Sequence, residues 1–405
     1  MTTRRGAKIK YMKKYYTIIW ISCIVTSANA QGTWTPKATF GGSGRNQAVG
    51  FSIGTKGYIG TGRDAASVFK DFWEWDKSTN VWTQKADFGG TARRGAAGFS
   101  IGTKGYIGTG LAGTSFKQDF WEYDPSVNQW TLKANFIGTA RFRTVAFSIG
   151  TKGYVGTGWN GSNYCTDFFE WDQLSDTWTA KTSFPGPGRD GAAGFAIGTK
   201  GYIGTGFDGT NNTQDFYEWD QATNIWTTKA NFGGGRRQYA TGTSIGSKGY
   251  IGTGIGLAGY MKDFWEYVPT SNTWIARANC GGTARQDPAG FSIGNYGYVG
   301  TGLDGLQKTD FWEYDPGVTS ASENNIENLV SIYPNPFSTQ ITISLNKEVN
   351  DASFIIYALS GKEAKILSFS GNKIIVEREN LVSGMYFYQI SSEDTSIAMG
   401  KLIIQ

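Results

Sequence analysis

The chain has 405 residues, with 57 glycines, an aromatic fraction of 15% and no histidine. The lack of histidine excludes a histidine-bearing catalytic triad, a histidine-ligated zinc or copper ion and a histidine general base. Residues 1–30 carry six cations and no acid, and without them 32 cations face 33 acids, so the positive net charge does not indicate a nucleic-acid partner and we expect none.

Residues 1–30 have the pattern of a secretory signal peptide. A basic stretch precedes an apolar run at 17–28, and Ala28-Asn29-Ala30 forms a small-x-small cleavage site. A start at Met1 or at Met12 fits this pattern equally well. We therefore expect an exported protein with no transmembrane span in its mature form.

Residues 31–317 repeat a unit of 48 residues, and such a period is typical of solenoids and propellers. Three features recur at this step: a tryptophan, an arginine and a GYxGTG segment. The tryptophans are Trp34, Trp82, Trp130, Trp178, Trp226 and Trp274. The sixth DFWE segment, at Asp310, arrives one residue early, which indicates a deletion in the loop before it.

Each unit contains four short strand signals. In the second unit they are GFSIG (98–102), GYIGTG (105–110), DFWEYD (119–124) and QWTLKANF (129–136). Aromatic and β-branched residues between Gly, Pro and Asn turns are typical of strands. Six units of four antiparallel strands predict an all-β propeller with six blades, because radial repetition hides the sheet edges.

The ends of the repeat region predict how the ring closes. The sixth unit ends at DFWEYDP (310–316) without a tryptophan strand, and the spare one stands at the front, at 32–37. We therefore expect the N-terminal strand to be the outer strand of the last blade.

These units resemble Kelch-repeat β-propellers. The resemblance covers about 31–317 and rests on Gly108-Thr109-Gly110, on Tyr123-Asp124 and on Trp130, although G-T-G replaces the usual glycine pair. Copper radical oxidases and sugar-acid mutarotases share this propeller, and the absence of histidine argues against their chemistry here. We expect no enzyme, no catalytic residue, no metal and no cofactor.

Alternating strand directions place the loops between second and third strands on one face. These loops differ in every unit, from RDAASVFK in the first to LDGLQKT in the sixth, and variable loops on a rigid frame commonly carry binding sites. The unrepeated candidates for ligand binding are Arg63, Arg143, Trp159, Tyr164, Tyr239 and Tyr260. Carboxylates also fall on or near this face, at Asp64, Asp190, Asp208, Asp287 and Asp304.

One arginine per unit precedes the first strand and is predicted to face the axial mouth. These residues are Arg45, Arg93, Arg141, Arg189, Arg237 and Arg285. A ring of guanidinium groups could bind acidic glycans, but a residue present in every unit is more simply structural. Each unit also has one glutamate in DFxE, so we predict Arg–Glu pairs within or between blades.

The remaining chain is predicted to be a polar linker at 318–328 and a small β-sandwich at 329–405. The tail resembles the C-terminal sorting domain of type IX secretion substrates in Bacteroidota. This resemblance rests on Tyr333-Pro334-Asn335-Pro336-Phe337, on Leu359-Ser360-Gly361-Lys362, on 381–386 and on 401–404. It implies the type IX machinery as a partner, and secretion or attachment at the outer surface.

Taken together, these patterns favour an exported binding or adhesion module for a glycan or a protein on the variable-loop face. Two alternatives stay open. A carbohydrate-processing enzyme would use a carboxylate pair on the same face, and a structural envelope component would have a flat, apolar face.

Overall fold

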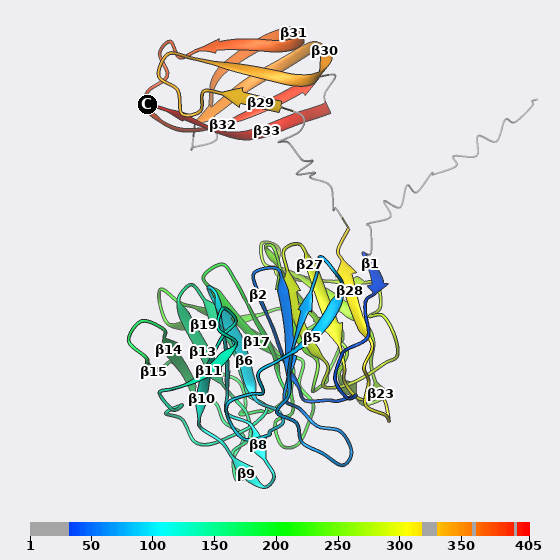
Figure 1. Ribbon diagram of the computed structural model, residues 1–405. Helices are drawn as coiled ribbons and strands as arrows, with labels where there is room; N and C mark the ends of the chain where they lie inside the picture. Colours follow the sequence, from blue (N-terminus) through cyan, green and yellow to red (C-terminus); the bar gives the residue numbers. More distant parts are fainter. Residues whose placement is uncertain (1–31, 318–329, 359–361, 393–394) are drawn as a thin grey trace, which may run out of the picture. The chain divides into compact units, whose positions relative to one another are not determined.

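The computed structural model describes residues 32–317, 330–358, 362–392 and 395–405, which divide into two compact units after Gly317. The predicted signal peptide and linker lie outside the described residues. In the described ranges there is no helix of the length and apolar character needed to cross a membrane. The fold class is all-β, as predicted (Figure 1).

Six four-stranded antiparallel sheets make up the first unit. Sheet I contains β2 (Val49–Ile53), β3 (Lys56–Gly60), β4 (Phe72–Asp76) and β5 (Val81–Lys85). Sheet II contains β6 (Ala97–Ile101), β7 (Lys104–Gly108), β10 (Phe120–Asp124) and β11 (Gln129–Lys133). Sheet III contains β12 (Val145–Ile149), β13 (Lys152–Gly156), β14 (Phe168–Asp172) and β15 (Thr177–Lys181).

The other three sheets follow the same plan. Sheet IV contains β16 (Ala193–Ile197), β17 (Lys200–Gly204), β18 (Phe216–Asp220) and β19 (Ile225–Lys229). Sheet V contains β20 (Thr241–Ile245), β21 (Lys248–Gly252), β24 (Phe264–Val268) and β25 (Thr273–Arg277). Sheet VI contains β26 (Ala289–Ile293), β27 (Tyr296–Gly300), β28 (Phe311–Asp315) and β1 (Thr33–Pro36). Two small hairpins, β8–β9 (Leu111–Ala112, Ser115–Phe116) and β22–β23 (Ile255–Gly256, Gly259–Tyr260), lie in variable loops.

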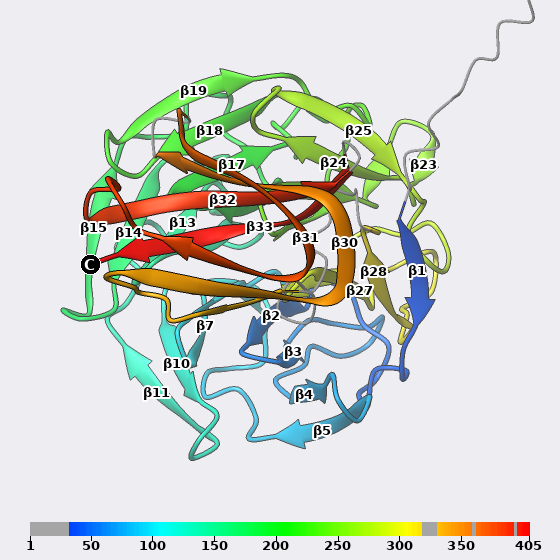
Figure 2. The same cartoon turned by 90° about the horizontal axis from the view of Figure 1, so that it is seen from above.

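The first strands of the six sheets form a closed ring. They contact one another in the order β2, β6, β12, β16, β20, β26 and back to β2. Figure 2 shows the sheets arranged around the resulting axis. This arrangement is a β-propeller.

The N-terminal strand closes the ring as predicted. β1 pairs antiparallel with β28, with Trp34 opposite Tyr314. The Trp34 indole donates a hydrogen bond to the carbonyl of Ala278 in the neighbouring sheet V, at 3.0 Å. The equivalent tryptophans repeat this contact around the ring, for example Trp82 to the Ala38 carbonyl at 3.0 Å, so each outer strand is tied to the preceding repeat.

The first glycine of each GYxGTG segment allows neighbouring sheets to approach closely. A Cβ atom added at Gly105 would lie 2.3 Å from the Phe51 ring of sheet I, and one at Gly153 would lie 2.2 Å from the Phe99 ring of sheet II. Because no side chain fits there, this repeated glycine is a packing requirement of the aromatic core between sheets.

The invariant arginines pair with aspartates, so the predicted Arg–Glu pairing is wrong. Arg45 makes two parallel hydrogen bonds to Asp71, at 2.6 and 2.8 Å, and a third to the Thr61 carbonyl at 3.0 Å. Trp73 donates to the same aspartate at 2.8 Å. The equivalent pairs are Arg93–Asp119, Arg141–Asp167, Arg189–Asp215, Arg237–Asp263 and Arg285–Asp310.

The glutamates have a different partner because of their register. Glu74 lies opposite Tyr58 on the neighbouring strand and accepts its hydroxyl hydrogen bond at 2.7 Å. Asp71 instead lies in the loop before β4, next to the arginine. All six guanidinium groups are fully buried, so the arginines do not line the mouth of the axis as predicted.

The second unit is rich in strands around one core. Its strands are β29 (Val330–Tyr333), β30 (Gln340–Ala358), β31 (Glu363–Glu377), β32 (Gly384–Ser392) and β33 (Thr395–Ile404). The long strand β30 contains both apolar segments Gln340–Leu345 and Ala352–Ala358. Register shifts near Val349 interrupt the β30–β31 pairing, and side chains from both halves of β30 share one apolar core.

Candidate functional site at the axial mouth

A ring of six backbone hydrogen bonds surrounds the axis on the variable-loop face. One residue before each first strand donates its amide to the carbonyl of its counterpart in the neighbouring sheet, at 2.7 to 3.2 Å. The six ring residues are Gln47, Gly95, Arg143, Gly191, Tyr239 and Asp287, and all six have positive φ. Two of the six are glycines, so only four have a side chain larger than hydrogen. We call the site around this ring the axial mouth.

Arg143 lies at the centre of the polar cluster in the axial mouth. Its guanidinium nitrogens are 3.5 Å from a carboxylate oxygen of Asp190 and 3.7 Å from one of Asp287. The same group donates to the Tyr239 hydroxyl and lies 3.8 Å from the centre of that ring. The four residues come from sheets III, IV, V and VI, so the ring brings together side chains far apart in the sequence.

Several buried polar atoms around this cluster have no hydrogen-bond partner within the part of the chain that the structure describes. The acceptors are Asn46 Oδ1, Gln47 Oε1, Asp190 Oδ1, Gln238 Oε1 and Asp287 Oδ2, and the donors are Asn46 Nδ2, Arg63 Nε and Arg143 Nε. Asn46 is fully buried and Asp190 is 5% exposed. An unpaired buried polar group is unfavourable by about 1–3 kcal/mol, so such a concentration is typical of a site that a ligand or water completes.

Burial sets the electrostatics of the two carboxylates. It raises the pKa of Asp190 and the pKa of Asp287 above the usual range, although the positive charge of Arg143 opposes the shift in both. Asn46 and Gln47 lie close enough to Asp287 to lower its pKa slightly. Burial lowers the pKa of Arg143, but the charges of Asp287, Tyr239 and Asp190 outweigh it and raise this pKa overall.

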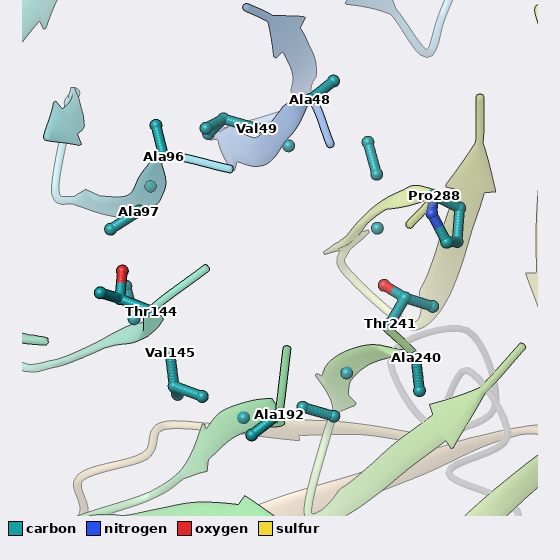
Figure 3. A pocket seen from close by; sticks show the side chains of 18 residues that line it. Ala48, Val49, Ala96, Ala97, Thr144, Val145, Ala192, Ala240, Thr241 and Pro288 are labelled. Carbon is teal, nitrogen blue, oxygen red and sulfur yellow. The ribbon is translucent and has the colours of Figure 1, made fainter. Parts of the chain in front are cut away.

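Beneath the mouth the first strands enclose a channel of about 160 Å³. Small and β-branched side chains line it (Figure 3), among them Ala48, Ala96, Thr144, Ala192 and Ala240. No charged side chain lines this channel. The charged groups of the site therefore belong to the mouth and to the loops around it.

Three of the five carboxylates singled out in the sequence stabilise their own loops. Asp64 accepts the amides of Ala66 and Ser67, and Asp208 accepts those of Thr210 and Asn211. Asp304 accepts the Leu306 amide and pairs with Lys308 at 2.7 Å. Only Asp190 and Asp287 reach the axial mouth.

A chain of aromatic side chains extends from the mouth over sheets II, III and IV. Trp159 lies 4.5 Å from Tyr164, and Tyr164 lies 5.8 Å from Phe207, between ring centres. Phe142 pairs with Trp159 through the backbone and lies 5.7 Å from Phe116. All five are partly exposed, and we call them the aromatic arc.

The structure thus divides the predicted site residues into three groups. Arg143 and Tyr239 lie in the axial mouth, and Arg63 borders it through a backbone bridge to Asn46. Trp159 and Tyr164 lie in the aromatic arc. Tyr260 is exposed in the β22–β23 hairpin and pairs with Ile255.

The sequence reasoning missed Asn46, Gln47 and Gln238 as members of the site and gave Asp190 and Asp287 no specific role. A signal was present, because positions 46 and 47 directly follow an arginine that every unit keeps, yet the residues there differ from unit to unit. The positions that vary from unit to unit directly after the repeated arginine are therefore those that form the axial mouth. The two cysteines contribute nothing to it, since Cys165 and Cys280 are buried free thiols. In the described residues no group of three or more Cys, Asp or Glu could hold a metal ion.

Comparison with known proteins agrees with both units. Residues 331–405 match the family model of the secretion system C-terminal sorting domain. A solved structure described as that of YjhT superposes with a TM-score of 0.59 at 17% identity, covering 68% of this chain and 95% of that chain. No curated protein matches the chain.

The first unit is therefore a propeller, and YjhT supports this fold alone. The tail carries a type IX sorting domain, so the protein is exported and is either secreted or attached at the outer surface.

Proposed function

We propose that the first unit is a six-bladed Kelch-type propeller that binds a glycan at the axial mouth, outside the cell. The observation that carries this proposal is the set of buried polar atoms without partners around Arg143. Both donors and acceptors are unpaired, and hydroxyl groups of a sugar supply both. Partly exposed aromatic rings beside the mouth support a sugar as the ligand, because amphipathic rings pack against its apolar faces.

A glycan array probed with the mature chain, residues 31–405, tests this proposal. We expect a restricted set of glycans to bind, and we expect Asp287→Asn to lose them while thermal melting shows an intact fold. Asp304→Asn is a matched control, since it makes the same change in a loop of the same sheet, at a carboxylate that pairs with Lys308 and does not reach the mouth. Glycan binding that is unchanged in Asp287→Asn would place the site elsewhere.

A carbohydrate-processing enzyme is the second candidate. The observation that favours it is that Asp190 and Asp287 both contact the guanidinium of Arg143 and both have raised pKa values. A carboxyl with a raised pKa suits a general acid. Incubation of array-positive glycans with the protein and mass spectrometry of the products separates the two functions, because a binding module releases none.

A further inference from the structure

We propose that the ligand is an extended neutral oligosaccharide that enters the axial mouth by one end and runs outward along the aromatic arc, over sheets II to IV. This inference rests on the proposed function and adds to it the charge class of the ligand and the direction of its chain. It uses two observations. The first is the set of charged and polar side chains in the mouth, and the second is the unequal distribution of aromatic residues around it.

The charges of the mouth exclude an ionic end group. Arg143 lies 3.5 Å from Asp190 and 3.7 Å from Asp287, and both carboxylates are nearly buried. Arg63 and Arg94 are close enough for their charges to act on this cluster. A ligand of either sign therefore meets like charge in a desolvated site. A neutral polyhydroxyl end meets no such repulsion, and it can satisfy the unpaired donors and acceptors together.

The asymmetry becomes clear when equivalent positions are compared. Three repeat slots supply the aromatic arc. In sheets II to IV five of the nine positions are aromatic, namely Phe116, Phe142, Trp159, Tyr164 and Phe207, and the other four are Arg94, Leu111, Asp190 and Asn212. In sheets V, VI and I the same three slots contain Gln238, Ile255, Tyr260, Gln286, Leu303, Gln307, Asn46, Arg63 and Val68. Tyr260 is the single aromatic residue among these nine positions.

The arc is continuous with the mouth. The Arg143 guanidinium lies 5.2 Å from the centre of the Phe142 ring, and the charges of Asp190 and Arg143 affect the pKa of Tyr164. A sugar chain whose end contacts Arg143 therefore meets Phe142 and Tyr164 next. Among the described residues, the equivalent positions of sheets V, VI and I offer only Tyr260, so the direction over sheets II to IV is favoured.

The test measures affinity against chain length by calorimetry, with neutral gluco-, manno- and xylo-oligosaccharides from the monosaccharide to the hexasaccharide. We expect affinity to rise with length in at least one series and then to level off. Trp159→Leu and Tyr164→Val use residues that other units place in these slots, so the fold should tolerate them. Each should weaken the longer oligosaccharides about tenfold and the monosaccharide by less than about twofold, as for a truncated aromatic anchor.

Tyr260→Val is the matched control, with the same change in the same slot of sheet V, and it should bind every length like the parent protein. Equal losses in Tyr164→Val and Tyr260→Val, or affinity independent of length, would overturn the path while leaving the proposed function intact. Tighter binding of oligogalacturonate or of deacetylated chitosan fragments would overturn the neutral class. Failure of all the sugars to bind would refute the proposed function itself.

Discussion

At the scale of single residues, the axial mouth combines a left-handed backbone, which favours glycine, with side chains larger than hydrogen. The backbone is left-handed at all six ring positions, with φ of 56° at Arg143 and 60° at Tyr239. Glycine adopts this conformation without penalty and occupies two of the six positions, whereas other residues lose about 1 kcal/mol or more. Because the scaffold fixes the conformation, the four larger side chains are present for what they contact.

Tyr239→Gly tests this interpretation. We expect the free energy of unfolding to change by less than about 1 kcal/mol, because relief of the left-handed strain offsets the lost contact with Arg143. Glycan binding should be lost. Urea unfolding and the glycan array measure the two effects, and a large loss of stability together with intact binding would contradict the argument.

The buried Arg–Asp pairs give a second prediction at this scale. Arg141→Ala should lower the free energy of unfolding by about 3 kcal/mol, near the lower limit for breaking a buried pair because Asp167 is partly exposed. Glu170→Gln removes the charge of the predicted but incorrect partner and should have a much smaller effect. Comparable losses in Arg141→Ala and Glu170→Gln would argue against the observed pairing.

The two classes of aspartate also predict different responses to acid. Hydrogen bonds and charge from the arginines lower the pKa of Asp71, Asp119 and Asp310, although their partial burial opposes this shift. A carboxylate with a lowered pKa stabilises the fold above its unfolded pKa, about 3.9, and this stability is lost only as the pH falls through the lower folded value.

Asp190 and Asp287 have raised pKa values, so they become protonated at a higher pH than ordinary carboxylates. Binding that uses their charged forms should therefore weaken before the fold does as the pH falls. Calorimetry and circular dichroism over one pH series check the order. Simultaneous loss of binding and of fold would count against it.

At the scale of elements, the sequence predicts most of the propeller because each structural requirement recurs at a fixed step. Glycines that admit a neighbouring phenylalanine, such as Gly105, and tryptophans that tie the sheets, such as Trp82, return every 48 residues. The partner of each arginine was not predictable in this way. The Asp and the Glu of DFxE both return in every unit, three positions apart, so periodicity cannot distinguish them, and only the register of β4 against β3 does.

The axial mouth was only partly predictable for a related reason. Arg143 and Tyr239 stood out because no other unit has them in that slot. Asp190 precedes Gly191 and looks like an ordinary turn residue in the sequence. Its role depends on its contact with Arg143 of the neighbouring sheet III, and no local pattern encodes such a contact.

Ring closure by β1 leads to a prediction at this scale. Deleting residues 31–40 should lower the melting temperature by several degrees, because β28 would lose its antiparallel partner and Phe264 would lose the ring of Trp34 that packs against it. Differential scanning calorimetry measures the change. A melting curve that stays unchanged would show that β1 is dispensable.

At the scale of the whole molecule, the chain combines a rigid propeller with a separate sorting unit. The sorting domain establishes export, while the binding function rests on the propeller alone. Removing residues 329–405 in a host with type IX secretion should therefore leave the propeller in the periplasm. Cell fractionation and antibody labelling of intact cells detect this outcome, and surface display of the truncated chain would be incompatible with the sorting role.

The backbone ring of the axial mouth has a consequence for how such proteins diversify. Its six hydrogen bonds use main-chain groups only, so exchanging a side chain at any ring position leaves them in place. Evolution can therefore vary the side chains at six convergent positions without breaking the ring, as immune receptors vary their loops on a constant frame. A library built on these six codons, weighted toward Gly, Asn and Asp for their tolerance of left-handed backbone, would make this propeller a source of new specificities.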